Sequence, residues 1–178
     1  FSSSVIDTVI SHLRERLFYL SDEGLFFTNQ PNLNRMILSI EDNVSQNEIY
    51  EEERRLIEEH ISREKKFKIY IHPKFPKDVP DNEDLKLIIL NTKEPDREFI
   101  EKYGEYPRVF RNTTIFLCVD EENKGVLVAY IKKLIALEKL NKDMKDKIIN
   151  LSDNQKKELE DKLKRHKDRE YEELRKFF

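Results

Sequence analysis

The stretch YPRVFRNTTIFLCVDEENKG (residues 106–125) decides the fold, because its apolar part, TTIFLCV, has the composition and length of a buried β-strand. Two further strand patterns precede it: FKIYIH (residues 67–72) alternates, and LKLIIL (residues 85–90) is almost entirely apolar. Runs that are apolar on both faces and are separated by helices are typical of a parallel sheet covered by helices. We therefore predict an α/β fold with a small, mostly parallel sheet flanked by helices.

Helical patterns occupy most of the remaining chain, so we expect a helix-rich protein. Residues 4–20 begin with serines suited to cap a helix and continue with apolar residues at helical spacing. Residues 46–64 have a strongly charged helical pattern. The pattern at residues 124–140 is apolar around much of its circumference, which predicts a buried helix. Ser152 and Gln155 predict a capping box that opens a long C-terminal helix, whose thin apolar seam favours a projecting arm.

The region after the first predicted helix has the pattern of a β-hairpin. Two short aromatic runs flank the sequence SDEG, which places Gly24 where a turn needs a positive φ. Asn32 directly follows Pro31 and is a natural cap for the next helix. A helix followed by a hairpin forms the last part of a winged-helix module, so we expect a piece of a longer protein. We predict three segments: a winged-helix-like helix and hairpin at 1–45, an α/β domain at 46–150 and a projecting C-terminal helix at 151–178.

The composition limits the classes of partner. Acidic residues (36) and basic residues (33) nearly cancel to a net charge of −3, so any site for a polyanion must be local. No run approaches the roughly 20 apolar residues of a membrane span, and no signal peptide is recognisable, so we expect no membrane partner. The single cysteine, Cys118, excludes an intramolecular disulfide and favours a reducing, cytoplasmic location.

The acidic pair Asp120 and Glu121 after the last predicted strand raises the question of nucleotide hydrolysis. P-loop enzymes place a magnesium ligand and a catalytic acid at such a strand end, but they also need a glycine-rich loop ending in GK[ST]. No GK[ST] sequence occurs, and none of Gly24, Gly104 and Gly125 heads such a loop. We therefore interpret Asp120 as the cap of the turn into the next helix, and we predict no catalytic residue, no cofactor and no ATPase activity for this chain alone.

Two arginines lie just before the amino end of the last predicted strand. A pair such as Arg108 and Arg111 can hold a phosphate or a carboxylate with paired hydrogen bonds. The alternative is an ion pair with the acidic helices, and Asn112 is equally suited to bond its own backbone in a turn. The candidates for nucleotide or phosphate contact are Arg108, Arg111 and Asn112.

The predicted hairpin also offers a route to nucleic acid, because a wing can lie along the DNA backbone with arginines on the phosphates. Acidic residues at the turn oppose this role, and packing of the aromatic residues in a core is the favoured alternative. The candidates for nucleic-acid contact are Arg14, Arg16, Arg35, Asn32 and Asn34. The four histidines lie far apart and have no Cys or His neighbour at ligand spacing, so the sequence predicts no metal site.

Two motifs resemble a known family. The stretch YL…EGLFFTNQPNLNR (residues 19–35) and the stretch RVFRNTTIFLCVD (residues 108–120) are similar to the later region of a family of large P-loop ATPases catalogued as domain of unknown function 499. The motif order matches over about residues 10–165. The residues of this chain that the resemblance matches to the family's two motifs are Pro31, Asn32, Asn34, Arg35, Arg108, Arg111 and Asn112.

The resemblance implies an AAA-like ATPase whose phosphate-binding loop, ATP and magnesium belong to a separate, earlier domain, and some members of the family occur in phage-defence systems. The expected function of this chain is then a non-catalytic accessory region that couples nucleotide state to a partner or to assembly. Two alternatives stay open: a nucleic-acid-binding module that uses the hairpin, and an oligomerisation domain that self-associates through the C-terminal helix. The expected partners are the rest of the larger ATPase polypeptide, DNA or a second copy of the chain.

Overall fold

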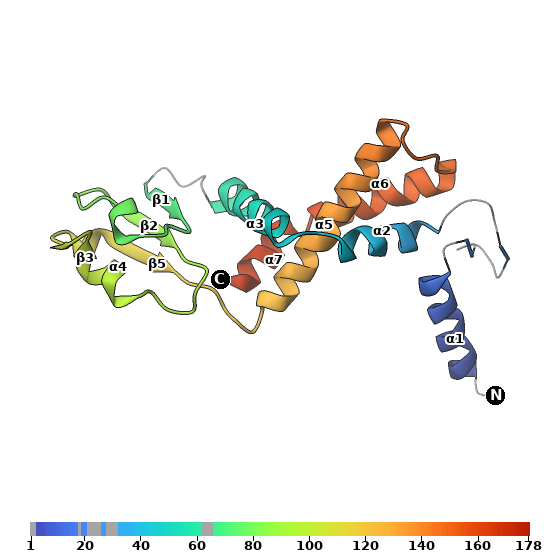
Figure 1. The fold of residues 1–178 in the computed structure, drawn as a ribbon, viewed down its shortest axis with the longest axis horizontal. Coiled ribbons are helices and arrows are strands. Elements are labelled where there is room, and N and C mark those ends of the chain that lie inside the picture. Colours follow the sequence, from blue (N-terminus) through green and yellow to red (C-terminus); the bar gives the residue numbers. More distant parts are fainter. Residues whose placement is uncertain (1–2, 18, 21–25, 28–31, 62–65) are drawn as a thin grey trace. The chain divides into compact units, whose positions relative to one another are not determined.

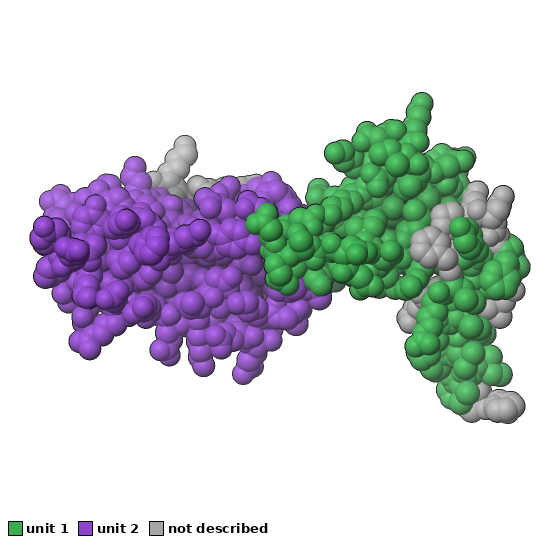
Figure 2. Space-filling view, in the orientation of Figure 1, with its two compact units in different colours: residues 1–49, 130–169 green, residues 50–129, 170–178 purple. Residues whose placement is uncertain are grey.

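The computed structural model describes residues 3–17, 19–20, 26–27, 32–61 and 66–178, and these form a helix-rich α/β protein with a small parallel sheet (Figure 1). The side chains of Ser3, Arg14 and Glu15 are outside this description. Two compact units divide the chain: unit 1 combines residues 1–49 with 130–169, and unit 2 combines residues 50–129 with 170–178 (Figure 2). The predicted fold class is confirmed.

Unit 1 is built from helices. It contains α1 (Ser3–Arg16), α2 (Leu33–Asp42), the start of α3 (Gln46–Ile61), most of α5 (Lys124–Lys145) and α6 (Asp153–Lys167). Apolar side chains of α2, α5 and α6 form one buried cluster, with the α5–α6 connection adding Leu151. Its fully buried members are Leu33, Ile37, Ala136, Leu137, Leu140, Leu151 and Leu159. The predicted capping box is confirmed, because the Ser152 hydroxyl accepts from the Gln155 amide and the Gln155 side chain accepts from the Ser152 amide.

Unit 2 contains the parallel sheet. Its strands are β1 (Lys68–Ile71), β2 (Lys86–Ile89) and β5 (Thr114–Leu117), in the order β1-β2-β5. Alternate residues point to opposite faces, so β2 sends Ile89 into a cluster with Ile57 of α3 and Leu174 of α7 (Glu170–Phe177), and Ile88 into a second cluster. The strands are apolar on both faces because both faces of the sheet are covered.

Short elements surround the sheet of unit 2. The connection from β1 to β2 carries a 3₁₀ turn, η1 (Pro76–Asp78), and a second such turn, η2 (Arg111–Thr113), precedes β5. Between β2 and η2 lie α4 (Arg97–Glu101) and a small antiparallel hairpin of β3 (Lys102–Tyr103) and β4 (Tyr106–Pro107). The hairpin turns at Gly104, whose φ of 60° lies in the left-handed region that suits glycine.

The C-terminal region is helical, as predicted, but it consists of two helices, α6 and α7, with a break at residues 168–169. Its apolar seam does not project as expected, because Leu159 is buried in unit 1, and Leu174 and Phe177 are buried in unit 2. The predicted segment boundaries therefore differ from the compact units, each of which joins two distant stretches of the chain.

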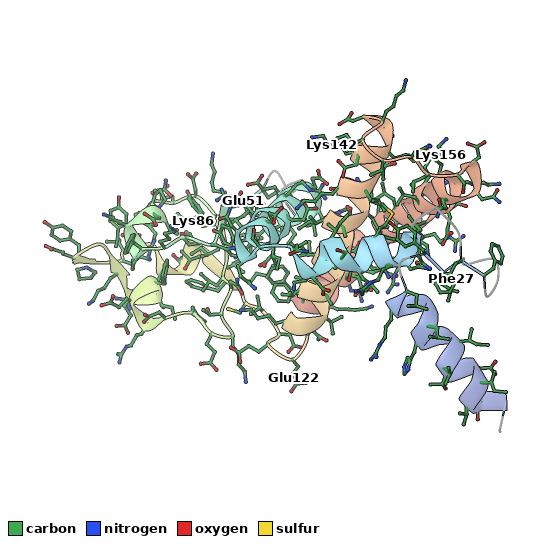
Figure 3. All side chains as sticks on the ribbon, turned by 45° about the vertical axis from the view of Figure 1, so that its right-hand side comes forward. Phe27, Glu51, Lys86, Glu122, Lys142 and Lys156 are labelled. Carbon is green, nitrogen blue, oxygen red and sulfur yellow. The ribbon has the colours of Figure 1, made fainter. Side chains whose placement is uncertain are left out.

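The predicted N-terminal hairpin is described in part. An antiparallel bridge joins Leu20 to Phe27, whereas the predicted turn with Gly24 lies outside the described residues. The expected core packing of the aromatic residues is wrong for those that the structure describes. Tyr19, Phe26 and Phe27 are all exposed, Phe27 by 73% (labelled in Figure 3). None of the described helices is long and apolar enough to cross a membrane.

Candidate functional site

Arg108, the first of the predicted phosphate contacts, forms hydrogen bonds with backbone carbonyls of unit 2. Its guanidinium is buried, with 3% of the residue exposed, and it donates to the carbonyls of Pro76 (3.1 Å), Val79 (3.2 Å) and Pro80 (3.4 Å). Burial lowers the pKa of Arg108, and the nearby Asp81 carboxylate opposes that shift. A phosphate would have to displace three carbonyl acceptors, so the geometry assigns Arg108 to holding the proline-rich connection between β1 and β2.

Arg111 and Asn112 lie on the surface at the same edge of the sheet. Arg111 Nε donates to the Arg108 carbonyl at 3.1 Å, and its terminal nitrogen reaches the Glu101 carbonyl at 3.5 Å. These bonds position the side chain without burying it. The structure thus separates the predicted set: Arg108 is internal, whereas phosphate contact by Arg111 and Asn112 stays a prediction.

Two residues that the sequence analysis passed over complete this edge. The Asp81 carboxylate accepts from the amides of Val109 (2.7 Å) and Phe110 (2.9 Å). Burial alone would raise the pKa of Asp81, but these two hydrogen bonds hold it below its ordinary value. Lys86 (labelled in Figure 3) is fully buried and donates to the carbonyls of Asn82 and Asp84 and to the Thr113 hydroxyl. Burial lowers the pKa of Lys86. The amino edge of the sheet is therefore a network of internal polar contacts.

Asp120 has the capping role that the sequence predicted. Its carboxylate accepts from the Glu122 amide at 3.0 Å and from the Asn123 side chain at 2.9 Å. The Asn123 amide donates to the Asp120 carbonyl, which closes the turn into α5. These contacts use both carboxylate oxygens of Asp120 for local structure.

The carboxyl edge of the sheet holds a different set of polar side chains. His72 follows β1, Asn91 lies two residues after β2, and Glu53 reaches the same place from α3. Glu53 Oε1 lies 3.6 Å from His72 Nε2, and the side chains are 7% and 6% exposed. The Tyr50 ring lies beside the imidazole with a centroid distance of 5.6 Å. Carboxyl ends of parallel strands are where open α/β sheets bind their ligands.

The buried pair of Glu53 and His72 favours its uncharged forms. Burial raises the pKa of Glu53, which Lys124 only partly offsets. Burial also lowers the pKa of His72, and the positive charges of Arg54 and Lys124 add to that shift. A carboxyl group with a raised pKa beside an imidazole with a lowered pKa is an arrangement that can take up or release a proton when a charged group arrives.

Several polar atoms at this edge have no hydrogen-bond partner among the described residues: Glu53 Oε1, both ring nitrogens of His72 and Asn91 Oδ1. Such buried atoms are uncommon in folded proteins. His72 also has a φ of 48°, a backbone conformation that is strained for a residue with a side chain. A pocket of about 350 Å³ adjoins them, and its walls include His72, Asn91, Thr92, Glu94, Asp96 and Phe99. The acidic rim suits a small molecule with amino or other hydrogen-donating groups.

The predicted nucleic-acid contacts are dispersed in unit 1. Asn32 is buried, and its side chain donates to the Leu20 carbonyl at 3.1 Å and accepts from the Arg35 amide at 3.0 Å. It caps α2, as predicted, and ties that helix to the bridge at Leu20. Arg16 is exposed and Asn34 and Arg35 are half-buried, whereas the Arg14 side chain lies outside the described residues. DNA contact by the arginines stays a prediction, and Asn32 is engaged internally.

Comparison of this chain with models of protein families, with curated proteins and with solved structures finds no match. The resemblance to the ATPase family therefore rests on the two motifs. Within those motifs, Asn32 and Arg108 are buried and bond the backbone.

Proposed function

We propose that this chain is a non-catalytic accessory region of a larger P-loop ATPase, where it couples nucleotide state to a partner or to assembly. The observation that carries the proposal is the apolar face of α1. Val5, Ile6 and Val9 are each 50% exposed and Leu13 is 40% exposed. Their spacing places them on one stripe of the helix, and such a stripe in contact with water marks an interaction surface. We call these four residues the α1 face.

The occupant that we propose for the α1 face is another part of the same ATPase polypeptide. The resemblance implies neighbouring domains, and an apolar helix stripe is the ordinary means of packing one helix on another. The motif residues support the non-catalytic part of the proposal, because Asn32 and Arg108 bond backbone groups and Asp120 caps a turn. A cytoplasmic location belongs to the same proposal, with ATP and magnesium bound by the earlier domain.

The test is a charge placed on the α1 face of the full-length ATPase. Val9→Asp should lower ATP turnover at least tenfold, because a carboxylate at a packed apolar contact prevents docking. Ser11→Asp is the matched control, since it adds the same charge to an exposed position on the opposite side of α1. Circular dichroism confirms folding of both variants. Equal turnover by the wild type, Val9→Asp and Ser11→Asp would overturn the proposed coupling through α1.

Nucleic-acid binding is the second candidate function, and the exposed rings of Phe26 and Phe27 favour it. Aromatic side chains on a surface can stack on unpaired bases, and the exposed Arg16 can contact phosphate. Fluorescence anisotropy of a labelled single strand, and of a duplex, at low and at near-physiological salt tests this function. Binding that weakens steeply with salt and is lost in Phe27→Ala supports it, whereas no binding at low salt excludes it for this chain.

A further inference from the structure

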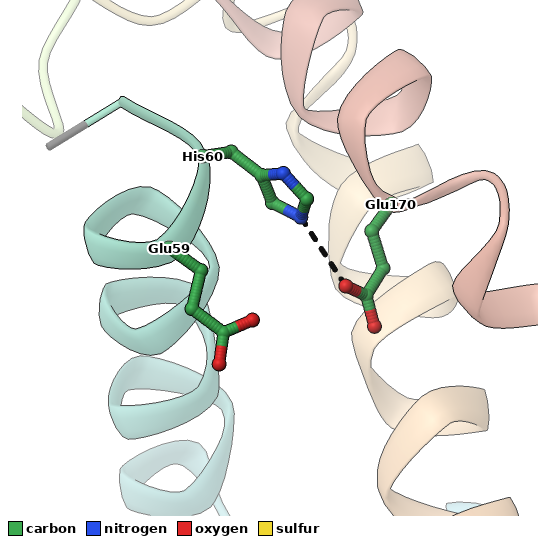
Figure 4. Close-up of side chains that lie close together, drawn as sticks. All are labelled: Glu59, His60 and Glu170. Carbon is green, nitrogen blue, oxygen red and sulfur yellow. Dashed lines mark hydrogen bonds and ion pairs between the residues drawn. The ribbon is translucent and has the colours of Figure 1, made fainter. Parts of the chain in front are cut away.

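We propose that Glu59, His60 and Glu170 of unit 2 form a binding site for a divalent cation of the zinc type. Glu59 and His60 are in the last turn of α3, and Glu170 is the first residue of α7. One potential ligand atom from each side chain lies within 4.8 Å of the other two. Figure 4 shows the imidazole of His60 directed at the Glu170 carboxylate, with Glu59 beside them.

The spacing of the first two ligands suits a metal. His60 Nε2 lies 3.2 Å from Glu170 Oε2. Two ligand atoms on a tetrahedral zinc, each at about 2.0–2.1 Å from the ion, are separated by about 3.3 Å. The two atoms form a hydrogen bond at this distance in the structure, so an ion would take the place of the proton that they share. The Glu59 side chain is half-exposed and its Oε2 pairs with Arg55 Nη1 at 2.8 Å, so coordination of an ion would share or replace this exposed ion pair.

Burial of Glu170 is an independent observation that favours a bound cation. The residue is only 7% exposed, yet its Oε1 accepts no hydrogen bond from any described residue. The closest cationic group that the structure gives for this oxygen is Arg55, at 3.7 Å. A carboxylate oxygen that is removed from water without a donor is costly, and a bound cation removes that cost.

The charged side chains around the site favour the binding of a divalent cation. Arg55 forms ion pairs with three carboxylates, those of Glu52, Glu59 and Glu170. Its Nε and a terminal nitrogen contact Glu52, and its other terminal nitrogen contacts Glu59 at 2.8 Å. When all three carboxylates are ionised, the single guanidinium of Arg55 leaves two of their negative charges without compensation from that residue. A divalent ion supplies that compensation.

The donor types select the class of metal. Carboxylates alone suit magnesium or calcium, whereas an imidazole nitrogen together with carboxylate oxygens suits zinc and its neighbours. Three protein ligands leave a fourth position for water. His60 and Glu170 are 110 residues apart in the sequence, so a bound ion would fasten the end of α3 to the start of α7.

The experiment is calorimetric titration of zinc chloride into the tag-free chain after treatment with a chelator. We expect one zinc ion per chain with a micromolar or lower Kd, and a higher thermal midpoint when zinc is present. His60→Ala and Glu59→Gln should each weaken binding at least tenfold. Glu59 is exposed, so Glu59→Gln leaves the fold intact even if a buried variant such as Glu170→Gln does not fold. The matched control is His12→Ala, which removes an exposed histidine of unit 1 and should bind zinc like the wild type.

Three results would overturn the proposal. The first is the absence of heat and of a thermal shift in the wild type at 100-fold excess of zinc over protein. The second is wild-type affinity in both His60→Ala and Glu59→Gln, which would place the bound ion elsewhere. The third is binding of magnesium but not zinc, which would reject the assigned class of metal.

Discussion

At the scale of single residues, the buried guanidinium of Arg108 holds the connection between β1 and β2 by hydrogen bonds to its carbonyls. The Arg108 guanidinium is planar and carries donors in several directions, so it can satisfy three carbonyls that a lysine could not reach together. The half-buried Asp81 accepts from two backbone amides, and the buried Lys86 donates to two backbone carbonyls. These contacts explain why a connection rich in proline keeps one shape beside the sheet.

Arg108→Ala should destabilise unit 2 strongly, because it leaves buried carbonyls without donors. We expect a loss on the order of 2–3 kcal/mol, the cost of abandoning several hydrogen bonds to a charged group. Urea unfolding followed by circular dichroism measures the effect. Arg111→Ala is the control, since Arg111 is exposed and its removal should change stability by less than about 0.5 kcal/mol. Similar losses for the two variants would show that Arg108 has no special structural role.

The pair of Glu53 and His72 predicts a dependence of stability on pH. Burial raises the pKa of Glu53, so the folded state binds more protons than the unfolded chain and stability falls as the pH rises above the ordinary value for glutamate. Burial lowers the pKa of His72, so stability also falls as the pH drops below the ordinary value for histidine. Only the first of these two effects disappears in Glu53→Gln.

Glu53→Gln should therefore gain stability relative to the wild type over the range of pH above 4.5, the ordinary pKa of glutamate. We expect a gain on the order of 1 kcal/mol, because a pKa shift of one unit corresponds to about 1.4 kcal/mol and glutamine has no carboxyl group to titrate. Urea unfolding at three pH values in this range measures it, with Glu51→Gln, an exposed change on the same helix, as the control. Parallel pH profiles for the wild type and Glu53→Gln would mean that Glu53 is ionised throughout, in an ion pair with His72.

Part of the pocket at the carboxyl edge of the sheet could be predicted from the sequence. His72 is the last residue of one predicted strand and Asn91 directly follows the next, and polar residues at such positions indicate a ligand-binding edge. Glu53 carries no such signal, because it belongs to a helix with many acidic residues. Its burial depends on α3 packing against the sheet, which no local pattern reports. For the same reason, the spacing of the histidines gave no indication of the cluster around His60.

At the scale of elements, the caps were the most predictable feature. Asn32 and the pair of Ser152 and Gln155 form the hydrogen bonds that their positions predict, because a cap depends on three or four neighbouring residues only. The three strands of the sheet were also predictable, β2 and β5 from nearly continuous apolar runs and β1 from its alternating pattern. The break between α6 and α7 was not, because charged residues continue across residues 168–169 without Gly or Pro.

The cap at Asn32 yields a prediction for unit 1. Asn32→Ala removes the acceptor for the Arg35 amide and the donor to the Leu20 carbonyl, so we expect a loss of about 1–2 kcal/mol. Thermal unfolding followed by circular dichroism measures the loss. Asn34→Ala is the matched control, since it makes the same chemical change inside α2, where alanine is a better helix former than asparagine. A smaller effect at position 32 than at position 34 would contradict the assigned role of Asn32.

At the scale of the whole molecule, the chain passes between its two units three times: within α3, within α5 and between α6 and α7. Each unit is therefore completed by residues from the end of the sequence. Leu159 closes the helical core of unit 1, whereas Leu174 and Phe177 cover the sheet of unit 2. A division into consecutive segments could not reveal this arrangement, because helical periodicity shows that a face is apolar but not which partner covers it.

The last nine residues should accordingly control the stability of the sheet while leaving the helical unit unchanged. Leu174→Ala opens a cavity beside Ile57 and Ile89, and we expect a cost of about 2–5 kcal/mol. Hydrogen exchange measured by mass spectrometry should show faster exchange in β1, β2 and β5, with no change in α6. Glu172→Ala, an exposed change in the same helix, is the control and should leave both regions protected. Equal acceleration in α6 and in the strands would show instead that the two units unfold as one cooperative body.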